Sequence, residues 1–295
     1  MTDSAEKIQK VLARTGYGSR REVERWIASG RLKVDGRLAV LGDRISAANK
    51  VSLDDKQLFL SWELYQQRVL AYYKPEGEIC SRHDPDHKKT IFDHLPNLSI
   101  GRWIAAGRLD INTTGLILLS NDGQLINRLM HPSHEIEREY AVRVLGEVND
   151  DIINNLKQGV MLEDGLAKFD NIKFSGGEGA NRWYHVVLKE GRNREVRRLW
   201  ESQGLMVSRL SRIRFGNISL QRGQKQGKFR DLEHAELKQL YQSVGLKYQS
   251  LDKGAKGKLT KSPSSKYNKT TPSKRIQTNR GKLLTPKRLK NKKRS

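Results

Sequence analysis

Residues 107–123 read GRLDINTTGLILLSNDG, and this stretch determines how the rest of the chain is interpreted. One carboxylate, Asp110, lies between Arg108 and a short polar run, and the apolar run LILL follows at residues 116–119. A run this short is typical of a buried strand rather than a helix, and the Asn-Asp-Gly that comes next indicates a turn. The stretch therefore predicts an acid on a loop that leads directly into a core strand, which is how many enzymes present catalytic groups.

Three structural roles for Asp110 compete with a catalytic one. It could cap a turn, which is the commonest role of a loop aspartate. It could open a calcium-binding loop, but the twelfth position is Asn121 instead of Glu, and LILL supplies no ligands. It could form a surface ion pair with Arg108 of little energetic consequence. The rest of the chain must decide between these roles.

The charge of the chain indicates a polyanionic partner. Its 295 residues carry a formal net charge of +23, with a pI near 10.1. A basic excess of this size is typical of proteins that bind RNA, DNA or an acidic membrane surface. Residues 251–295 contain sixteen Lys or Arg and one Asp, which gives +15 of the +23. We interpret residues 246–295 as a disordered basic tail that binds RNA without sequence preference.

Several classes of protein are disfavoured. The only cysteine is Cys80, so the chain forms no internal disulfide and no zinc site built on several thiolates. The N-terminal MTDSAEKIQK lacks the apolar core of a secretory signal, and no apolar run approaches the roughly 20 residues that span a bilayer. We therefore expect a cytoplasmic protein with no membrane partner.

Cofactor and metal motifs are also missing. The glycine cluster at residues 175–179 is followed by a predicted strand, so it lacks the helix N-terminus that would hold a phosphate. No Walker loop or well-placed GxGxxG occurs, and the spacing of His83, Asp84, Asp86 and His87 matches no familiar metal site. We expect neither a nucleotide cofactor nor a metal.

The first 60 or so residues form a separate basic module. Apolar residues at helical spacing predict a helix from Ile8, and Ser19 with Glu22 forms a capping box that starts a second helix. The turn Asp35-Gly36 between apolar residues predicts a hairpin. The second helix carries Arg20, Arg21 and Arg25 on its polar faces, which suit either a solvated surface or RNA phosphates. Basic residues on the hairpin favour the phosphates.

This module resembles the S4 RNA-binding domain over KIQKVLARTGYGSRREVERWIASGRLKVDG. The resemblance implies that the three arginines contact RNA. A second arginine cluster lies in GRNREVRRLW, which opens a predicted helix with an apolar face of Val196, Leu199 and Trp200. Because like charges on one helix repel, we expect this cluster to face phosphates as well.

The full set of motifs points to one family. GRLDINTTGLILLSNDG, EREYAVRV and GRNREVRRLW, in that order behind an S4-like module, resemble the bacterial pseudouridine synthases of the small-subunit synthase A family. The likeness covers about residues 6–240. It implies an α+β protein: an S4 domain at 1–62, a catalytic domain with a mixed, mostly antiparallel sheet at 66–245, and the tail at 246–295. It also implies a monomer that isomerises uridine in RNA without a cofactor.

The resemblance assigns roles to four residues. Asp110 is the essential catalytic group, either as nucleophile or as the base that starts glycal formation. Tyr140 stacks on the target uracil, Arg197 pairs with Asp110 and lowers its pKa, and Arg108 contacts the phosphate beside the target. One departure from the family pattern is that Arg194 and Glu195 stand where relatives often carry His and Gln.

Three further segments resemble those members of the family that act on the large ribosomal subunit, and this resemblance implies the substrate. AYYKPEGEIC, NRLMHPSHEIEREYAVRV and FSGGEGANRWY imply a uridine of 23S rRNA in the peptidyl-transferase region, presented as 23S rRNA or as a pre-ribosomal large-subunit particle. Two other classes stay open. A ribosome-assembly factor without catalysis would explain the basic module and tail, and an RNA methyltransferase is disfavoured because no glycine-rich cofactor loop joins a strand to a helix.

Overall fold

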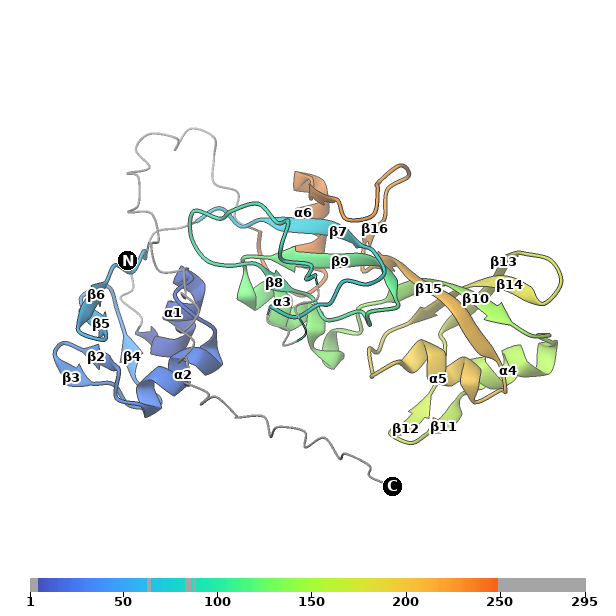
Figure 1. The fold of residues 1–295 in the computed structure, drawn as a ribbon, viewed down its shortest axis with the longest axis horizontal. Coiled ribbons are helices and arrows are strands. Elements are labelled where there is room, and N and C mark those ends of the chain that lie inside the picture. The colour runs from blue at the N-terminus through green and yellow to red at the C-terminus, as the bar shows by residue number, and fades with distance from the viewer. Residues whose placement is uncertain (1–4, 63–64, 83–85, 87–88, 249–295) are drawn as a thin grey trace, which may run out of the picture. The chain divides into compact units, whose positions relative to one another are not determined.

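The computed structural model describes residues 5–62, 65–82, 86 and 89–248 (Figure 1). Nearly all of the predicted basic tail, from residue 249 onward, lies outside the described residues. No helix in the described part is long and apolar enough to cross a membrane.

The N-terminal module contains the two predicted helices and more strands than the sequence predicted. Helices α1 (Ile8–Thr15) and α2 (Arg20–Ala28) come first, and the capping box closes as expected: the backbone N–H of Glu22 donates to Ser19 Oγ at 3.1 Å. The strands are β1 (Glu6–Lys7), which pairs with β4 (Arg44–Ile45), and a sheet in the order β3 (Arg37–Leu38), β2 (Leu32–Val34), β5 (Val51–Leu53) and β6 (Lys56–Leu58). Strands of two or three residues are too short to give a readable alternation, so only the hairpin β2–β3 was predicted.

The catalytic domain is built on one large sheet, which confirms the predicted α+β class. Its strands run in the order β13 (Asn171–Gly176), β14 (Asn181–Leu188), β10 (Arg138–Leu145), β15 (Met206–Phe215), β9 (Thr114–Ser120), β7 (Val69–Lys74) and β17 (Phe229–Asp231). Short β8 (Ile104–Ala105) pairs with β9, and β16 (Ile218–Ser219) pairs with β15. Every pairing is antiparallel except that of β15 with β9, so the sheet is mixed and mostly antiparallel, as predicted.

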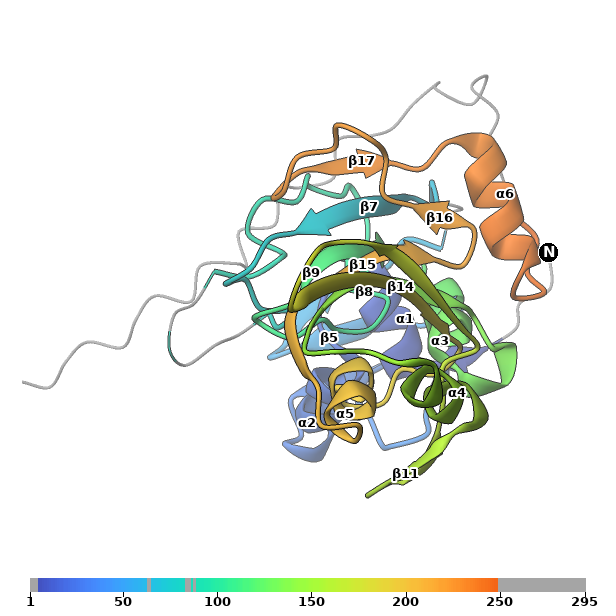
Figure 2. The ribbon, with the colours of Figure 1, turned by 90° about the vertical axis from the view of Figure 1, so that its right-hand side faces the viewer.

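Helices cover the two halves of the sheet separately. The helices are α3 (Gly123–Met130), α4 (Asp150–Gln158), α5 (Glu195–Glu201), α6 (His234–Gln242) and the 3-10 helix η1 (Pro132–His134). Strands β14 and β15 arch over α4 and α5 (Figure 2), and Trp200 of α5 is fully buried in the core between them. Apolar residues of α3 and α6 pack with those of β7 and β9 in a second cluster, which Leu246 and Tyr248 also contact. A small hairpin, β11 (Val160–Leu162) and β12 (Gly165–Ala167), lies outside the large sheet.

Strand β15 joins the two halves and brings two distant segments together. On one side Thr114, at the start of β9, is level with Ser211, and on the other side Tyr140 of β10 is level with Arg212. Gly115 has φ +116°, and a Cβ there would collide with the backbone N and O of Arg212. Glycine is therefore required for this close approach. As a result, the loop that precedes β9 and the tyrosine of β10 lie on opposite sides of the same point of β15.

Candidate active site

Asp110 and Tyr140 line one cavity of about 150 Å³. They lie 30 positions apart in the sequence, on the loop before β9 and on β10, and the pairing of both strands with β15 brings them together. Arg108 lines the same cavity. The remaining lining residues are Leu109, Thr113, Leu188, Gly191, Arg192, Asn193, Arg194, Glu195, Val196 and Leu210. Of the predicted site residues, Arg197 does not line the cavity.

Two buried cations fix the loop that carries Asp110. Lys74, which is fully buried at the end of β7, donates from Nζ to the carbonyl oxygens of Thr113 at 2.9 Å and Ile111 at 3.4 Å. Arg197 of α5 donates to the carbonyl oxygen of Asn112 at 3.2 Å. Three successive carbonyls are thus held by side chains from two different elements. Supporting hydrogen bonds of this kind hold the backbone around Asp110 more firmly than the loop could by itself.

The charges of these cations act on Asp110 through space. Burial lowers the pKa of Lys74, while the nearby Asp110 carboxylate is among the groups that raise it. Burial and the like charge of Arg194 lower the pKa of Arg197, and Asp110 again acts in the opposite direction. Two partly desolvated cations, Lys74 and Arg197, therefore interact with one carboxylate, that of Asp110.

The predicted ion pair between Arg197 and Asp110 is not present. Both guanidinium nitrogens of Arg197 that donate hydrogen bonds contact backbone carbonyls, those of Val207 at 2.9 Å and Asn112 at 3.2 Å. Arg197 is only 6% exposed. Through these two bonds its guanidinium connects α5 to β15 and to the Asp110 loop. The guanidinium of Arg197 is therefore engaged with backbone acceptors rather than with the acid. Its influence on the acid is electrostatic.

Tyr140 provides an aromatic wall to the cavity. It is 8% exposed and belongs to the core cluster beneath the arched half of the sheet, so packing fixes the ring. Its hydroxyl makes no hydrogen bond to any described residue. A ring held rigidly beside a carboxylate is suited to stacking on a planar base, which is the role the sequence predicted.

Arg108 is exposed, and among the described residues it forms no ion pair or hydrogen bond. The backbone beside it is held from Cys80, whose sulfur accepts a hydrogen bond from the N–H of Leu109 at 3.4 Å. Arg108 is thus a free cation on a positioned backbone at the mouth of the Asp110 cavity. This geometry suits the predicted contact with a phosphate.

The second arginine cluster differs from the prediction. Arg192 donates to Glu190 and to the carbonyl of Leu166, and Arg198 forms a two-bonded ion pair with Asp164 at 2.8 and 2.9 Å. Their guanidinium groups anchor the hairpin β11–β12 to α5 rather than face phosphates. The sequence argument failed because the acidic partner lies about 30 positions away, where spacing along one helix cannot show it.

Two cavity residues were not given a role by the sequence. Arg194 has a left-handed backbone with φ +48°, a strained conformation for arginine, and it pairs loosely with Glu201 at 3.6 Å. Glu195 is 4% exposed and accepts a hydrogen bond from the N–H of Arg192 at 3.0 Å. Burial raises the pKa of the Glu195 carboxyl. These are the two positions at which the sequence departs from the family pattern, and that departure was the available signal.

Lys74 was also missed as a site residue. In the sequence it follows the apolar run VLAYY and precedes Pro75, a pattern that indicates only the end of a strand. A lysine at the end of a predicted buried strand does, however, indicate a structural or functional contact, because lysine is rarely buried unless its ammonium group has partners.

The remaining predicted residues lie in the N-terminal module or outside the described chain. Arg20, Arg21 and Arg25 are all exposed, and none of them pairs with an acid in the part of the chain that the structure describes. His83, Asp84 and His87 lie outside the described residues. Within the described ranges, no group of three or more His, Cys, Asp or Glu side chains could hold a metal ion.

Comparison with known proteins agrees with this geometry. A model of the RNA pseudouridylate synthase family matches residues 68–202, and a model of the S4 domain matches residues 6–48. Ribosomal large subunit pseudouridine synthase B of Haemophilus influenzae is 57% identical over 244 residues, which are 82% of this chain and 68% of that protein. The protein of the same name from Escherichia coli K12 is 56% identical over 245 residues, 82% of this chain and 84% of that one. A solved structure, "Crystal structure of pseudouridylate synthase", superposes with a TM-score of 0.56 at 26% identity, covering 79% of this chain and 99% of that chain.

The chain belongs to the RNA pseudouridylate synthase family, a class of isomerases. Within that family it groups with the proteins named ribosomal large subunit pseudouridine synthase B, with which it shares more than half of its residues over the matched length. Family membership favours the catalytic interpretation over a ribosome-assembly factor without activity.

Proposed function

We propose that this chain converts one uridine of 23S rRNA, in the peptidyl-transferase region of the large ribosomal subunit, to pseudouridine. The names of its relatives refer to the ribosomal large subunit, which supports RNA of that subunit as the substrate. The observation that carries the proposal is the joint position of Asp110, Tyr140 and Arg108 around one cavity, with the Asp110 loop fixed by Lys74 and Arg197.

The chemistry needs only groups that the cavity contains. The bond from C1′ of the ribose to N1 of the uracil breaks, the base turns while it is held, and a bond forms between C1′ and C5. The proton on C5 is lost and N1 gains one, so there is no net oxidation or reduction. The carboxylate of Asp110 either attacks the sugar or the base, or removes a proton from the sugar at the start of the reaction. The charges of Lys74 and Arg197 interact with this carboxylate.

The aromatic wall and the free arginine account for how the substrate is held. A uridine in structured RNA must leave its base stack before a side chain can reach it, and a pocket with an aromatic face compensates for lost stacking. Tyr140 provides that face, and its fixed ring supports the base while the base turns. Arg108 at the mouth of the cavity contacts the phosphate beside the flipped nucleotide and stabilises the displaced backbone.

The assay uses ribosomal RNA that carries tritium at C5 of uracil. The wild-type protein, with no added cofactor, releases tritium because C5 loses its hydrogen when it bonds to the sugar. Asp110→Asn removes the charge and keeps the shape, so release falls by roughly 10³-fold or more while RNA affinity stays nearly unchanged. The matched control is Asp151→Asn, an exposed acid in the first turn of α4, which retains wild-type release.

The outcomes separate the competing interpretations. Release by Asp110→Asn at the wild-type rate contradicts the catalytic assignment. No release by either protein, with RNA binding intact, favours an RNA-binding factor without activity. Sequencing of pseudouridine sites in 23S rRNA from a deletion strain then identifies the target, and loss of a site outside the peptidyl-transferase region contradicts the proposed location.

We also infer that the chain acts as a monomer in the cytoplasm on 23S rRNA or on a pre-ribosomal large-subunit particle. The support for a monomer is that Asp110, Tyr140 and both anchoring cations come from one chain. Sedimentation of the active protein at assay concentration tests this: a single species of about 34 kDa is expected, in keeping with the chain mass of 33.8 kDa.

A further inference from the structure

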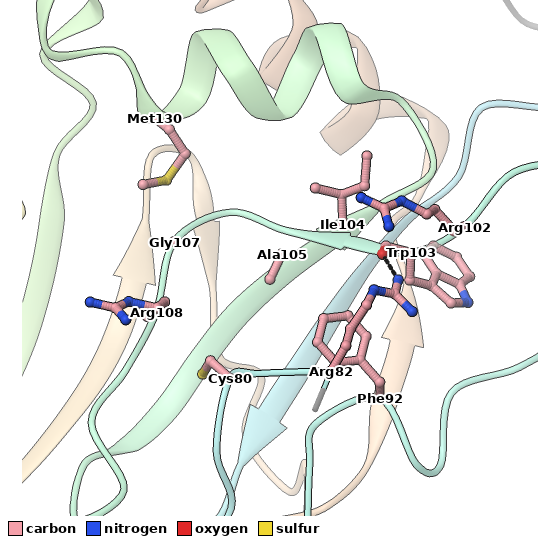
Figure 3. Close-up of a pocket in the computed structure, with 10 residues that line it drawn as sticks. All are labelled: Cys80, Arg82, Phe92, Arg102, Trp103, Ile104, Ala105, Gly107, Arg108 and Met130. Atoms are coloured by element: carbon pink, nitrogen blue, oxygen red, sulfur yellow. Dashed lines mark hydrogen bonds between the residues drawn. The ribbon is translucent and has the colours of Figure 1, made fainter. Parts of the chain in front are cut away.

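A second pocket shares Arg108 with the Asp110 cavity. It has a volume of about 340 Å³, and its walls come from residues 80, 82 and 92, the region around β8 and the end of α3 (Figure 3). Its lining residues are Cys80, Arg82, Phe92, Arg102, Trp103, Ile104, Ala105, Gly107, Arg108 and Met130. Because Arg108 lines both spaces, they are neighbours on the two sides of one side chain. We call the second space the arginine pocket.

Two guanidinium groups in this pocket lack an acidic partner. Arg82 donates to the carbonyl of Trp103, and its guanidinium carbon lies 4.3 Å from the ring centroid of Phe92. Arg102 is half-buried, and its Nε is buried without a hydrogen-bond partner. No acid in the described catalytic domain forms an ion pair with either one. In this respect they differ from Arg198 of α5, which forms an ion pair with Asp164.

The two cations also repel each other. Burial and the neighbouring charge of Arg102 lower the pKa of Arg82 to about 10, so both groups remain charged at neutral pH. Burial lowers the pKa of Arg102 as well, and the carboxylate of Glu22 acts in the opposite direction. Two partly desolvated charges of one sign carry an unfavourable free energy that a bound anion would remove.

The other wall of the pocket is apolar. Ala105 and Met130 line the side of the pocket away from Arg82 and Arg102, Ile104 lies beside the Arg102 guanidinium, and the phenyl ring of Phe92 packs against the Arg82 guanidinium. A free phosphate would use only the charged end of such a space. A phosphodiester with its sugar would use both, because the ribose carries the apolar surface that this wall accepts.

We propose that the arginine pocket binds a backbone phosphate of the substrate RNA, on the strand that flanks the target uridine, with the attached sugar against the apolar wall. Arg82 and Arg102 hold the phosphate, and Arg108 lies between this nucleotide and the one in the Asp110 cavity. The pocket thereby fixes the strand beside the flipped nucleotide. The inference rests on the proposed RNA substrate, and it adds a subsite to it.

The first test is the affinity for a 23S rRNA transcript as a function of salt. Arg102→Gln removes one charge that makes no hydrogen bond within the described protein, so binding weakens about tenfold. The slope of log affinity against log salt becomes smaller by about 0.7 to 0.9, as for one lost phosphate contact. Arg102→Lys keeps the charge and restores most of the affinity. The matched control is Arg222→Gln, which removes an exposed charge elsewhere on the catalytic domain.

Thermal unfolding separates a ligand role from a structural one. A charge that lacks a partner does not stabilise the fold, so the Tm of Arg102→Gln stays the same or rises. A loss of affinity that is accompanied by a lower Tm assigns Arg102 to the structure and overturns the proposal. Arg82→Gln is a second variant, with the same expected loss of affinity, for the case in which Arg102 proves structural.

Phosphate ethylation interference identifies the contact itself. Ethylation neutralises single phosphates of the transcript. Ethylation of one particular phosphate is expected to weaken binding of the wild-type protein and to leave binding of Arg102→Gln and Arg82→Gln unchanged. The same interference pattern for all proteins, or affinities equal to that of the Arg222→Gln control, overturns the proposal. Absence of tritium release from the wild type would contradict the proposed function instead, while the binding and interference results still report on the pocket.

Discussion

The two arginine-rich helices of this protein use the same residue in opposite ways. In α2, Arg20, Arg21 and Arg25 are exposed and lack acidic partners among the described residues. At the start of α5, by contrast, Arg198 pairs with Asp164 and Arg197 is buried against backbone carbonyls. Both helices look alike in the sequence, where each carries a dense run of positive charge.

The difference teaches what a basic run can mean. Arginine has five donors in a rigid fork, so it serves equally well as a phosphate contact or as a bridge between backbone carbonyls. Among the described residues, none of the α2 arginine side chains donates to a backbone carbonyl. Arg192 and Arg197, by contrast, donate to carbonyls of the hairpin β11–β12 and of the Asp110 loop. The first set is therefore available to RNA, and the second set supports the site.

The largest effect is expected at Arg197. Arg197→Met removes the side-chain donors to the carbonyls of Asn112 and Val207, which lowers the free energy of unfolding by roughly 3 kcal/mol. Because the Asp110 loop loses an anchor, kcat falls by about 10²-fold, as expected for a misplaced catalytic group. Denaturant unfolding and single-turnover tritium release measure the two changes.

Arg197→Lys is the control for charge. It keeps the cation but not the fork, so kcat is expected between that of the wild type and that of the methionine variant. If Arg197→Met kept its kcat and lost RNA affinity instead, Arg197 would belong with the α2 arginines, and the contrast between the two helices would disappear.

The next largest effect is expected in the N-terminal module. Replacing Arg20, Arg21 and Arg25 together by Gln weakens RNA binding on the order of tenfold or more and reduces the salt slope by about 2 to 3. The free energy of unfolding changes by no more than about 0.5 kcal/mol, because exposed side chains are replaced. Nitrocellulose filter binding over a range of salt, with chemical unfolding alongside, tests both statements.

A control variant with three substitutions removes the same amount of positive charge from a different surface. Arg222, Lys225 and Lys238 are exposed on the catalytic domain, and their replacement by Gln removes the same charge. Equal losses of affinity in the two triples would show that total charge, rather than the surface of α2, determines binding.

A smaller effect, which depends on pH, is expected at Glu195 within the α5 cluster. Its pKa is raised by burial, so the folded protein holds this proton more tightly than the unfolded chain does. Stability therefore falls as pH rises from the ordinary glutamate pKa through the raised one. Glu195→Gln removes this penalty and increases Tm by a few degrees at pH 7.5 but not at pH 4. A variant that is less stable at pH 7.5 would mean that the ionised carboxylate is needed.

The smallest effect is expected at Arg198. Its ion pair with Asp164 is exposed, and such pairs contribute little in water. Arg198→Ala should change Tm by no more than about 2 °C and leave RNA affinity unchanged. A clear loss of affinity would place this arginine on the RNA-binding surface, as the sequence first suggested, and would weaken the contrast with α2.

Local patterns were sufficient for most of the fold. The capping box at Ser19, the turn before α3 and the apolar run of β9 all lie where the sequence predicted, because each depends on residues within a few positions of one another. The strands β5 and β6 were missed because three residues do not form a readable alternation. The mixed, mostly antiparallel sheet came from family resemblance, since pairing between distant strands leaves no local pattern.

The residues that line the candidate site were predicted from the sequence, but the contacts that hold them in position were not. Asp110, Tyr140 and Arg108 were each named from motifs, and they line one cavity. The expected ion pair of Arg197 with the acid was wrong in its contacts, and Lys74 was not predicted at all. Both cations act through carbonyls of the Asp110 loop, and a carbonyl that needs a donor looks like every other carbonyl in a sequence.

The amino-acid sequence by itself determined which short segments are helices, strands and turns, and which acid stands at the start of the core strand. It did so because backbone conformation and amphipathic patterns depend on neighbouring residues. The tertiary structure alone decided which arginines remain free for RNA and which hold the protein together. That decision depends on partners such as Arg197 and Asn112, which are 85 positions apart and meet only after β9 and β10 have paired with β15.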